Sequence, residues 1–206
     1  MFFSFLLIAW YAPLERTMGI VQKIFYYHVP SAWVAFLAFG VVFVCSILYL
    51  TSRDKRWDTL AASSVEIGVL FSLIVLITGP IWARPVWGVW WTWEPRLTTT
   101  LILFLIYVAY LLLRYFGGEG DKTANFSAVL GIIGFINVPL VYLSINWWSA
   151  EAQVHPQRVG MGAEMKVAFF VSLFTFTVLY IYLLVRRIQV TNAQIAVDEL
   201  RQQRDE

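Results

Sequence analysis

The chain has 206 residues, of which 60% are hydrophobic and 14% are charged, and its formal net charge is +2. Ordinary soluble domains carry about 25% charged residues, so this composition excludes such a domain and indicates a membrane protein. The one cysteine, Cys45, excludes an intrachain disulfide, a CxxC redox pair and a CxxCH haem-attachment site.

Five apolar stretches approach the roughly 20 residues that a helix needs to cross the hydrocarbon core. They predict membrane-spanning helices over residues 30–50, 65–82, 97–113, 126–145 and 167–185. A further apolar stretch, residues 1–12, would be only about 18 Å long as a helix, which is short for a crossing. We expect an all-α, polytopic membrane helix bundle of six transmembrane helices over residues 1–185, the first of them short. A polar cytoplasmic tail, helical and without a site of its own, is expected over residues 186–206.

Lysine and arginine are distributed unequally between the two sides of these spans, and the richer side is expected to be cytoplasmic. That side holds Arg53, Lys55, Arg56, Arg114, Lys122, Arg186, Arg187, Arg201 and Arg204. The other side, expected to be the outer one, holds Arg16, Lys23, Arg84, Arg96, Arg158 and Lys166.

The central parts of the five spans contain no Asp, Glu, Lys, Arg or His. Such residues usually mark ion or proton pathways inside membranes, so their absence moves the expected chemistry to the loops. The main irregularity is the stretch INVPLVY, in which Pro139 predicts a packing kink and Asn137 a hydrogen bond to a neighbouring span.

Tryptophan is concentrated on the outer side, where nine of the ten are expected, and Trp57 alone lies on the cytoplasmic side. A general aromatic belt would occupy both interfaces, so it does not explain this asymmetry. The densest stretch is RPVWGVWWTWEPRLT, residues 84–98. A face formed by Trp87, Trp90, Trp91 and Glu94 at helical spacing predicts a short amphipathic helix on the outer surface, started by Pro85 and ended by Pro95.

Such an indole face suits a flat, apolar ligand, although a membrane-seeking surface helix would have the same pattern. Arg84 and Arg96 flank the stretch, and their guanidinium groups suit carboxylates on the rim of the ligand.

Both histidines, His28 and His155, fall on the outer side, each one or two residues before a proline. The prolines favour loop conformations. Either histidine alone would be an ordinary loop residue, but beside the tryptophans the pair suggests two axial ligands for one metal-centred macrocycle. Haem meets these demands together, because it is flat and mostly apolar, its iron accepts histidine, and its propionates attract cations. A quinone or sterol would leave the histidines without a role, and zinc would need further ligands.

With these residues identified, the stretch WGVWWTWEPRLTT resembles the tryptophan-rich signature of the haem-handling membrane proteins of cytochrome c biogenesis. The chain is most similar to the CcmC family within that group, and HVPSAW at the second span and the later outer histidine support the resemblance over most of its length. The resemblance implies that His28 and His155 bind the iron, and that the haem-facing signature comprises Trp87, Gly88, Trp90, Trp91 and Trp93. The family motif closes with Asp where this chain has Glu94, so the role of Glu94 stays open.

The resemblance further implies a haem b site on the periplasmic side of the bacterial inner membrane. Its implied function is delivery of haem to the chaperone CcmE, without catalysis and without a nucleic-acid partner. The implied partners are the ABC transporter subunits CcmA and CcmB and the small subunit CcmD.

Two alternatives stay open on sequence grounds. The spans themselves could carry haem across the bilayer, or the chain could be an enzyme, either a haem lyase relative or a b-type quinone oxidoreductase subunit. The enzymes would be expected to have additional histidines inside the spans.

Overall fold

The computed structural model describes residues 1–118, 120–147 and 160–205, and within these it is a bundle of helices without an extended sheet. The chain begins with two short helical turns, α1 and η1, and a 3-10 turn, η2, precedes the long helices. The elements are α1 (Phe2–Leu6), η1 (Leu7–Tyr11), η2 (Ile20–Ile24), α2 (Phe25–Ser52), α3 (Lys55–Trp87), α4 (Pro95–Gly117), α5 (Asp121–Trp147) and α6 (Ala163–Asp205).

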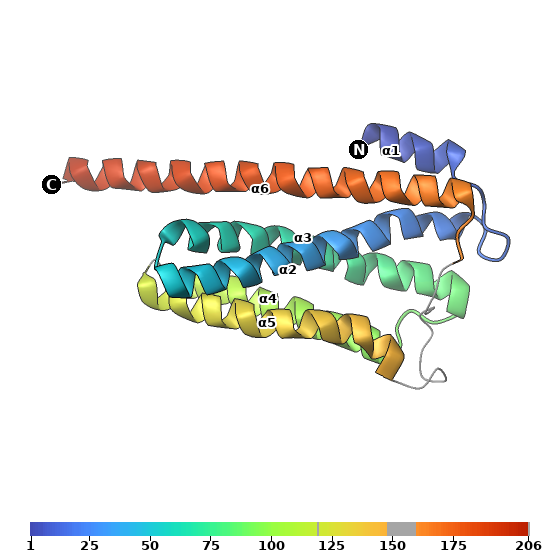
Figure 1. The fold of residues 1–206 in the computed structure, drawn as a ribbon, viewed down its shortest axis with the longest axis horizontal. Helices are drawn as coiled ribbons and strands as arrows, with labels where there is room; N and C mark the ends of the chain where they lie inside the picture. The colour runs from blue at the N-terminus through green and yellow to red at the C-terminus, as the bar shows by residue number, and fades with distance from the viewer. Residues whose placement is uncertain (119, 148–159, 206) are drawn as a thin grey trace.

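The five long helices lie roughly side by side, and their connections fall at two opposite ends of the bundle (Figure 1). One end carries η2, the α3–α4 connection and the start of α6, and we call it the tryptophan end. The other carries the α2–α3 and α4–α5 connections, and we call it the charged end. The described loops that the sequence analysis assigned to two opposite sides of the membrane therefore lie at two opposite ends of the bundle.

Among the described residues, five helices are long and apolar enough to cross a membrane. Each of the five predicted spans falls within one of them, so the prediction of a polytopic all-α bundle is confirmed. The first segment is helical but short, since its apolar part covers only Phe2–Tyr11. It packs against α6 through Ile8, Ala12 and Ala168, and the Ser4 and Ser172 hydroxyls lie 3.4 Å apart.

Small residues bring the helices into close contact in the middle of the bundle. At Gly68 of α3, a Cβ atom would lie 2.6 Å from Cε1 of Phe39 and 3.1 Å from Cβ of Ala38, both on α2. One turn away, the Ser64 hydroxyl donates to the Ala38 carbonyl at 2.9 Å. The Phe39 ring in turn stacks on Tyr107 of α4, with centroids 3.8 Å apart. Close backbone approach of this kind is how helices associate in lipid, where apolar burial alone provides little driving force.

The predicted polar contact within the membrane is confirmed. Nδ2 of Asn137 on α5 donates to the Thr99 carbonyl on α4 at 2.8 Å, with Pro139 one half-turn further along α5. The amide of Asn137 therefore has a hydrogen-bond partner on the backbone of a neighbouring span.

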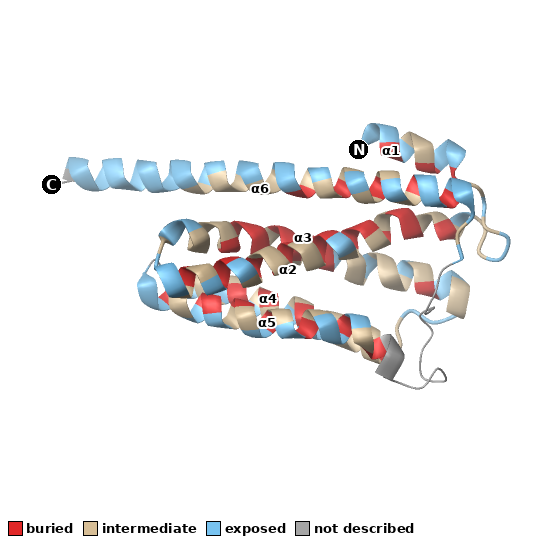
Figure 2. Ribbon diagram, viewed as in Figure 1, coloured by how far each residue is buried: buried red, intermediate tan, exposed pale blue. Residues whose placement is uncertain are grey.

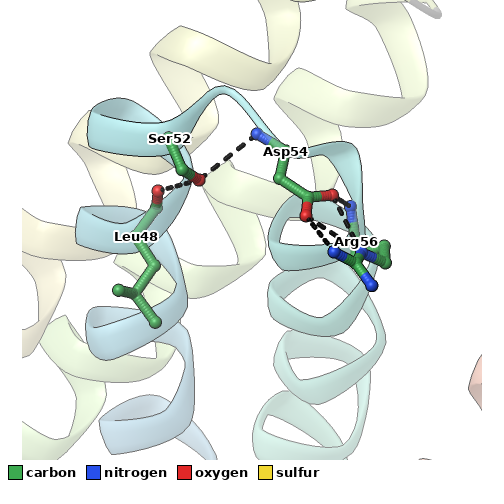
Figure 3. A network of polar contacts seen from close by, with 4 residues as sticks. All are labelled: Leu48, Ser52, Asp54 and Arg56. Carbon is green, nitrogen blue, oxygen red and sulfur yellow. Dashed lines mark hydrogen bonds and ion pairs between the residues drawn. The ribbon is translucent and has the colours of Figure 1, made fainter.

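A tight connection joins α2 to α3 at the charged end (Figure 3). Helix α2 ends where Arg53 adopts a left-handed conformation with φ 59°. Asp54 then caps α3, because its Oδ1 accepts the Arg56 N–H at 2.9 Å, and its carboxylate also binds the Arg56 guanidinium. These contacts lower the pKa of Asp54 below its ordinary value, and the hydrogen bond from the Arg56 side chain contributes most.

Ion pairs also link neighbouring helices at the charged end. The Arg114 guanidinium of α4 binds the Asp58 carboxylate of α3 through two bonds of 2.6 and 2.9 Å. Arg187 of α6 binds Glu66 of α3, with its Nη2 donating at 2.7 Å. Beyond Arg187, α6 continues as an exposed helix that extends past the bundle (Figure 2). This matches the expected helical tail.

We expect Gly68→Ala to destabilise the bundle by about 1–3 kcal/mol, because the added methyl group overpacks against a Phe39 ring that Tyr107 holds in place. The measurement is thermal or denaturant unfolding of the purified protein in detergent. The matched control is Gly40→Ala, whose Cβ would meet Cε2 of Phe135 at an ordinary 3.7 Å. The control should be neutral or up to about 1 kcal/mol more stable, since alanine favours helix. Equal effects of the two substitutions would contradict the close α2–α3 contact.

Candidate functional site

A cavity of about 510 Å³ opens at the tryptophan end of the bundle. It lies mainly between α2, α3 and α4, with single contributions from the α3–α4 connection, α5, α6 and the segments before η2 and α6. Most of its lining is apolar, and the charged or titratable side chains among the described lining residues are His28 and Arg96. Its lining includes Phe36, Ser72 and Leu103, which lie well inside the predicted spans.

His28 lies in the first turn of α2 and is 9% exposed, with its ring at the cavity. The expectation that it lies in a loop is wrong. The 3-10 turn η2 leads directly into α2, so the helix starts five residues before Pro30, and the proline is accommodated inside it. Packing of the first turn of α2, in which Phe25 and Tyr26 are buried, outweighs the local preference of the residues before a proline.

Residues of α3 surround the His28 imidazole. Its Nδ1 lies 2.8 Å from the Thr78 hydroxyl, and its ring meets Trp82 edge to face at a centroid distance of 5.8 Å. A Cβ atom at Gly79 would be 3.5 Å from its Cε1, so the bare backbone of Gly79 lies beside the ring. The imidazole is thus held between α2 and α3 while it lines the cavity.

The tryptophan-rich stretch has a different secondary structure from the one expected. Pro85 lies inside α3, which continues to Trp87 and ends at Gly88, a left-handed residue with φ 78°. The chain is then irregular to Glu94, and Pro95 starts α4 instead of ending a helix. The predicted short amphipathic helix is therefore wrong. Proline suits the first position of a helix, since its missing N–H would have no helical partner there.

The irregular connection separates the four tryptophans. Trp87 and Trp91 line the cavity, whereas Trp90 is 59% exposed and Trp93 is 76% exposed. The Trp91 and Trp93 rings contact each other edge to face at 5.8 Å. The indole N–H of Trp91 is buried and has no hydrogen-bond partner within the described part of the chain.

The two arginines that flank the stretch also differ. Arg96, in the first turn of α4, lines the cavity. Arg84 is exposed, does not line the cavity, and donates a hydrogen bond to the Gly88 carbonyl at the end of its own helix. Glu94, which precedes α4, is 4% exposed and interacts electrostatically with Arg96. The anionic rim of a ligand would therefore meet Arg96 more readily than Arg84.

Two methionines that the sequence did not single out, Met18 and Met161, also line the cavity. Met18 lies in a tight turn held by Glu15, whose Oε2 accepts the N–H of Met18 at 2.6 Å and that of Thr17 at 2.8 Å. These bonds lower the pKa of Glu15 below its ordinary value, and the bond from the Met18 N–H contributes most. The turn thereby fixes the backbone of Met18 beside the cavity.

His155, the second predicted ligand, lies outside the described residues, as does Trp148. Sequence reasoning also did not select Thr78, Gly79 or Trp82 as site residues. The signal for them is the stretch ITGPIW within an apolar span, because the proline frees a backbone carbonyl that is tolerated at membrane depth only where it faces protein or a cavity.

Comparison with known proteins identifies the family to which the chain belongs. The sequence model of the family described as CcmC, heme exporter protein C, matches residues 1–204. Heme exporter protein C of Bradyrhizobium diazoefficiens is 34% identical over 175 residues, which cover 84% of this chain and 66% of that relative. The Escherichia coli K12 protein of the same name is 31% identical over 143 residues, or 69% of this chain and 58% of its own length.

The matched region thus spans about two thirds or less of these two relatives. A ccmC-like mitochondrial protein of Marchantia polymorpha, named for cytochrome c biosynthesis, is 32% identical over 166 residues, covering 80% of this chain and 69% of that relative. The family match runs through every described helix, so this multi-pass membrane protein belongs to the heme exporter protein C family.

Proposed function

We propose that the protein holds haem b in the cavity at its tryptophan end and presents it to the haem chaperone CcmE during cytochrome c maturation. The observation that carries the proposal is one cavity that combines a histidine, an arginine and tryptophan side chains. Family membership supports the same reading, since the relatives are named heme exporters.

The residues of the cavity fit a flat, mostly apolar macrocycle. Its volume of about 510 Å³ falls within the range of roughly 300–1,000 Å³ typical of small-molecule sites. Trp82, Trp87, Trp91 and Phe36 provide aromatic lining, and Met18 and Met161 add flexible thioethers that adapt to an irregular outline.

We infer that His28 would bind the iron of haem, and that His155 would be its second ligand. Haem supplies an iron that accepts imidazole nitrogen at its axial positions. His28 suits this role because it lines the cavity while its Nδ1 is bonded to Thr78, so we assign Nε2 to the iron. The assignment of His155 rests on its position in the sequence.

We assign the anionic edge of haem to Arg96 and the indole N–H of Trp91. A guanidinium suits a carboxylate well, and the buried Trp91 donor lacks a partner among the described residues. Trp90 and Trp93, together with Gly88 and Glu94, then shape the connection that presents this edge. Arg84 stabilises the end of α3 instead.

In the cell, we propose that the tryptophan end faces the periplasm from the bacterial inner membrane. The arginine-rich charged end would then face the cytoplasm, as the distribution of Lys and Arg favours. CcmA, CcmB and CcmD would be the membrane partners, and the protein would act by binding and delivery without catalysis.

Transport of haem through this chain alone is less well supported. The described lining residues all belong to the half of the bundle near the tryptophan end, while the middle is closed by the Phe39–Tyr107 stack and the contact at Gly68. A holding site at one end agrees with this distribution.

We expect purified wild-type protein to bind added haem with a Soret band, and His28→Ala to lose most of the bound haem or shift that band, because an axial ligand is removed. Visible absorption spectra of both proteins in detergent provide the measurement. Imidazole added to His28→Gly should restore the band. A wild-type spectrum without a Soret band, or one that His28→Ala and His155→Ala leave unchanged, would contradict the proposal.

We expect Arg96→Gln to weaken haem binding by about tenfold or more, since hydrogen bonds to charged groups contribute roughly 1.5–3 kcal/mol. The measurement is haem titration, repeated with the dimethyl ester of haem, whose propionates carry no charge. Arg96→Gln should have little effect on binding of the ester. The matched control is Arg84→Gln, which should bind both ligands as wild type does. Equal losses for haem and its ester would exclude the propionate role of Arg96.

A further inference from the structure

The contacts of the Thr78 hydroxyl indicate which nitrogen of His28 carries a proton. The Thr78 Oγ1 lies 2.7 Å from the Ile74 carbonyl oxygen of its own helix and 2.8 Å from Nδ1 of His28. A hydroxyl has one proton, and a carbonyl oxygen can only accept, so the proton of Thr78 is donated to Ile74. The Thr78 oxygen must then accept from Nδ1–H of His28.

A neutral imidazole with its proton on Nδ1 carries the lone pair on Nε2. A lone pair is what a haem iron requires from an axial nitrogen, and metal-bound histidines commonly donate the other N–H to a neighbouring acceptor. Thr78 therefore selects the tautomer in which Nε2 is able to bind iron.

The same region of α3 fixes the orientation of the ring. Thr78 is β-branched and its bond to Ile74 restricts its side-chain rotamer, so the acceptor has a defined position. Gly79 leaves room for the Cε1 edge of the imidazole, since a Cβ atom at this position would already lie 3.5 Å from Cε1. Trp82 contacts the ring one turn later. An alanine at 79 would touch the ring at ordinary van der Waals distance, and a longer side chain would crowd it.

We propose that Thr78 is a positioning residue that sets the tautomer and orientation of His28 for iron binding. This inference rests on the proposed function, in which His28 ligates haem iron. Thr78 acts through His28 and need not touch the ligand, and it is absent from the residues that line the cavity.

The first test needs no haem. Protein labelled with ¹⁵N-histidine is compared by long-range ¹H–¹⁵N NMR correlations in wild type, Thr78→Val and Thr78→Ser, and the signals lost in His28→Ala identify His28. We expect a protonated Nδ1 and an unprotonated Nε2 in wild type. Thr78→Val should move the proton toward Nε2, and Thr78→Ser, which keeps the hydroxyl, should restore the wild-type pattern.

The second test uses haem-loaded protein. We expect Thr78→Val to weaken haem binding by about 10-fold to 100-fold, the usual cost of removing a hydrogen-bond partner of a metal ligand. The reduction potential should become more positive, because a histidine without its acceptor is a less basic ligand. Thr78→Ser should behave as wild type. The matched control is Thr175→Val, which removes a hydroxyl bonded in the same way to the Val171 carbonyl at 2.7 Å, on α6 away from the cavity.

The two possible failures are distinguishable. If the histidine nitrogens of Thr78→Val match those of Thr175→Val, and its haem affinity and potential are those of wild type, Thr78 has no positioning role while haem binding stands. If wild-type protein binds no haem, the proposed function fails, whatever the tautomer of the unloaded protein. Thermal unfolding of each variant separates a loss of folding from either result.

Discussion

The close approach of α2 and α3 is the contact on which the candidate site depends. It requires Gly68 at the crossing, where a side chain would collide with Phe39, and it is reinforced by the bond from Ser64 to the Ala38 carbonyl. Because this contact fixes the register of the two helices, it also sets which residue of α3 faces His28 some turns away. A shift of one residue along α3 would replace Thr78 with Ile77 or Gly79, and neither has a side chain that accepts a hydrogen bond from Nδ1.

The bundle is closed at its centre and open at one end for a physical reason. Stacked aromatic rings and small residues fill the middle, where any gap would forfeit packing contacts. Toward the tryptophan end, Pro80 deprives the Leu76 carbonyl of its helical hydrogen bond, and both residues line the cavity. Irregular backbone at this depth is tolerated where it faces protein or a cavity instead of lipid. The proline therefore belongs on the cavity side of α3.

The sequence predicted the spans, the polar tail and the bond of Asn137 to a neighbouring helix, because these depend on length, hydropathy and the cost of an unpaired amide in lipid. It did not predict the backbone at the start of α2 or in the connection between α3 and α4. The helical spacing of Trp87, Trp90, Trp91 and Glu94 predicted one helix through all four residues, but α3 ends at Gly88. The preference of residues before a proline for extended conformations predicted a loop at His28, which instead lies in α2. Both errors arise where local preference competes with packing between helices. His28, for example, is paired with Thr78, which lies 50 positions away in the chain.

The concentration of tryptophan at one end has two causes rather than one. Trp87 and Trp91 line the cavity, so their position follows from the shape of the site. Trp90 and Trp93 are exposed at the end of a membrane-spanning helix pair, where indoles generally partition between lipid and water. The irregular chain between Gly88 and Glu94 makes this division possible, because a continuous helix would have put Trp87, Trp90 and Trp91 on one face. A loop fixed at both ends by long helices can instead direct alternate indoles to the cavity and to the surface.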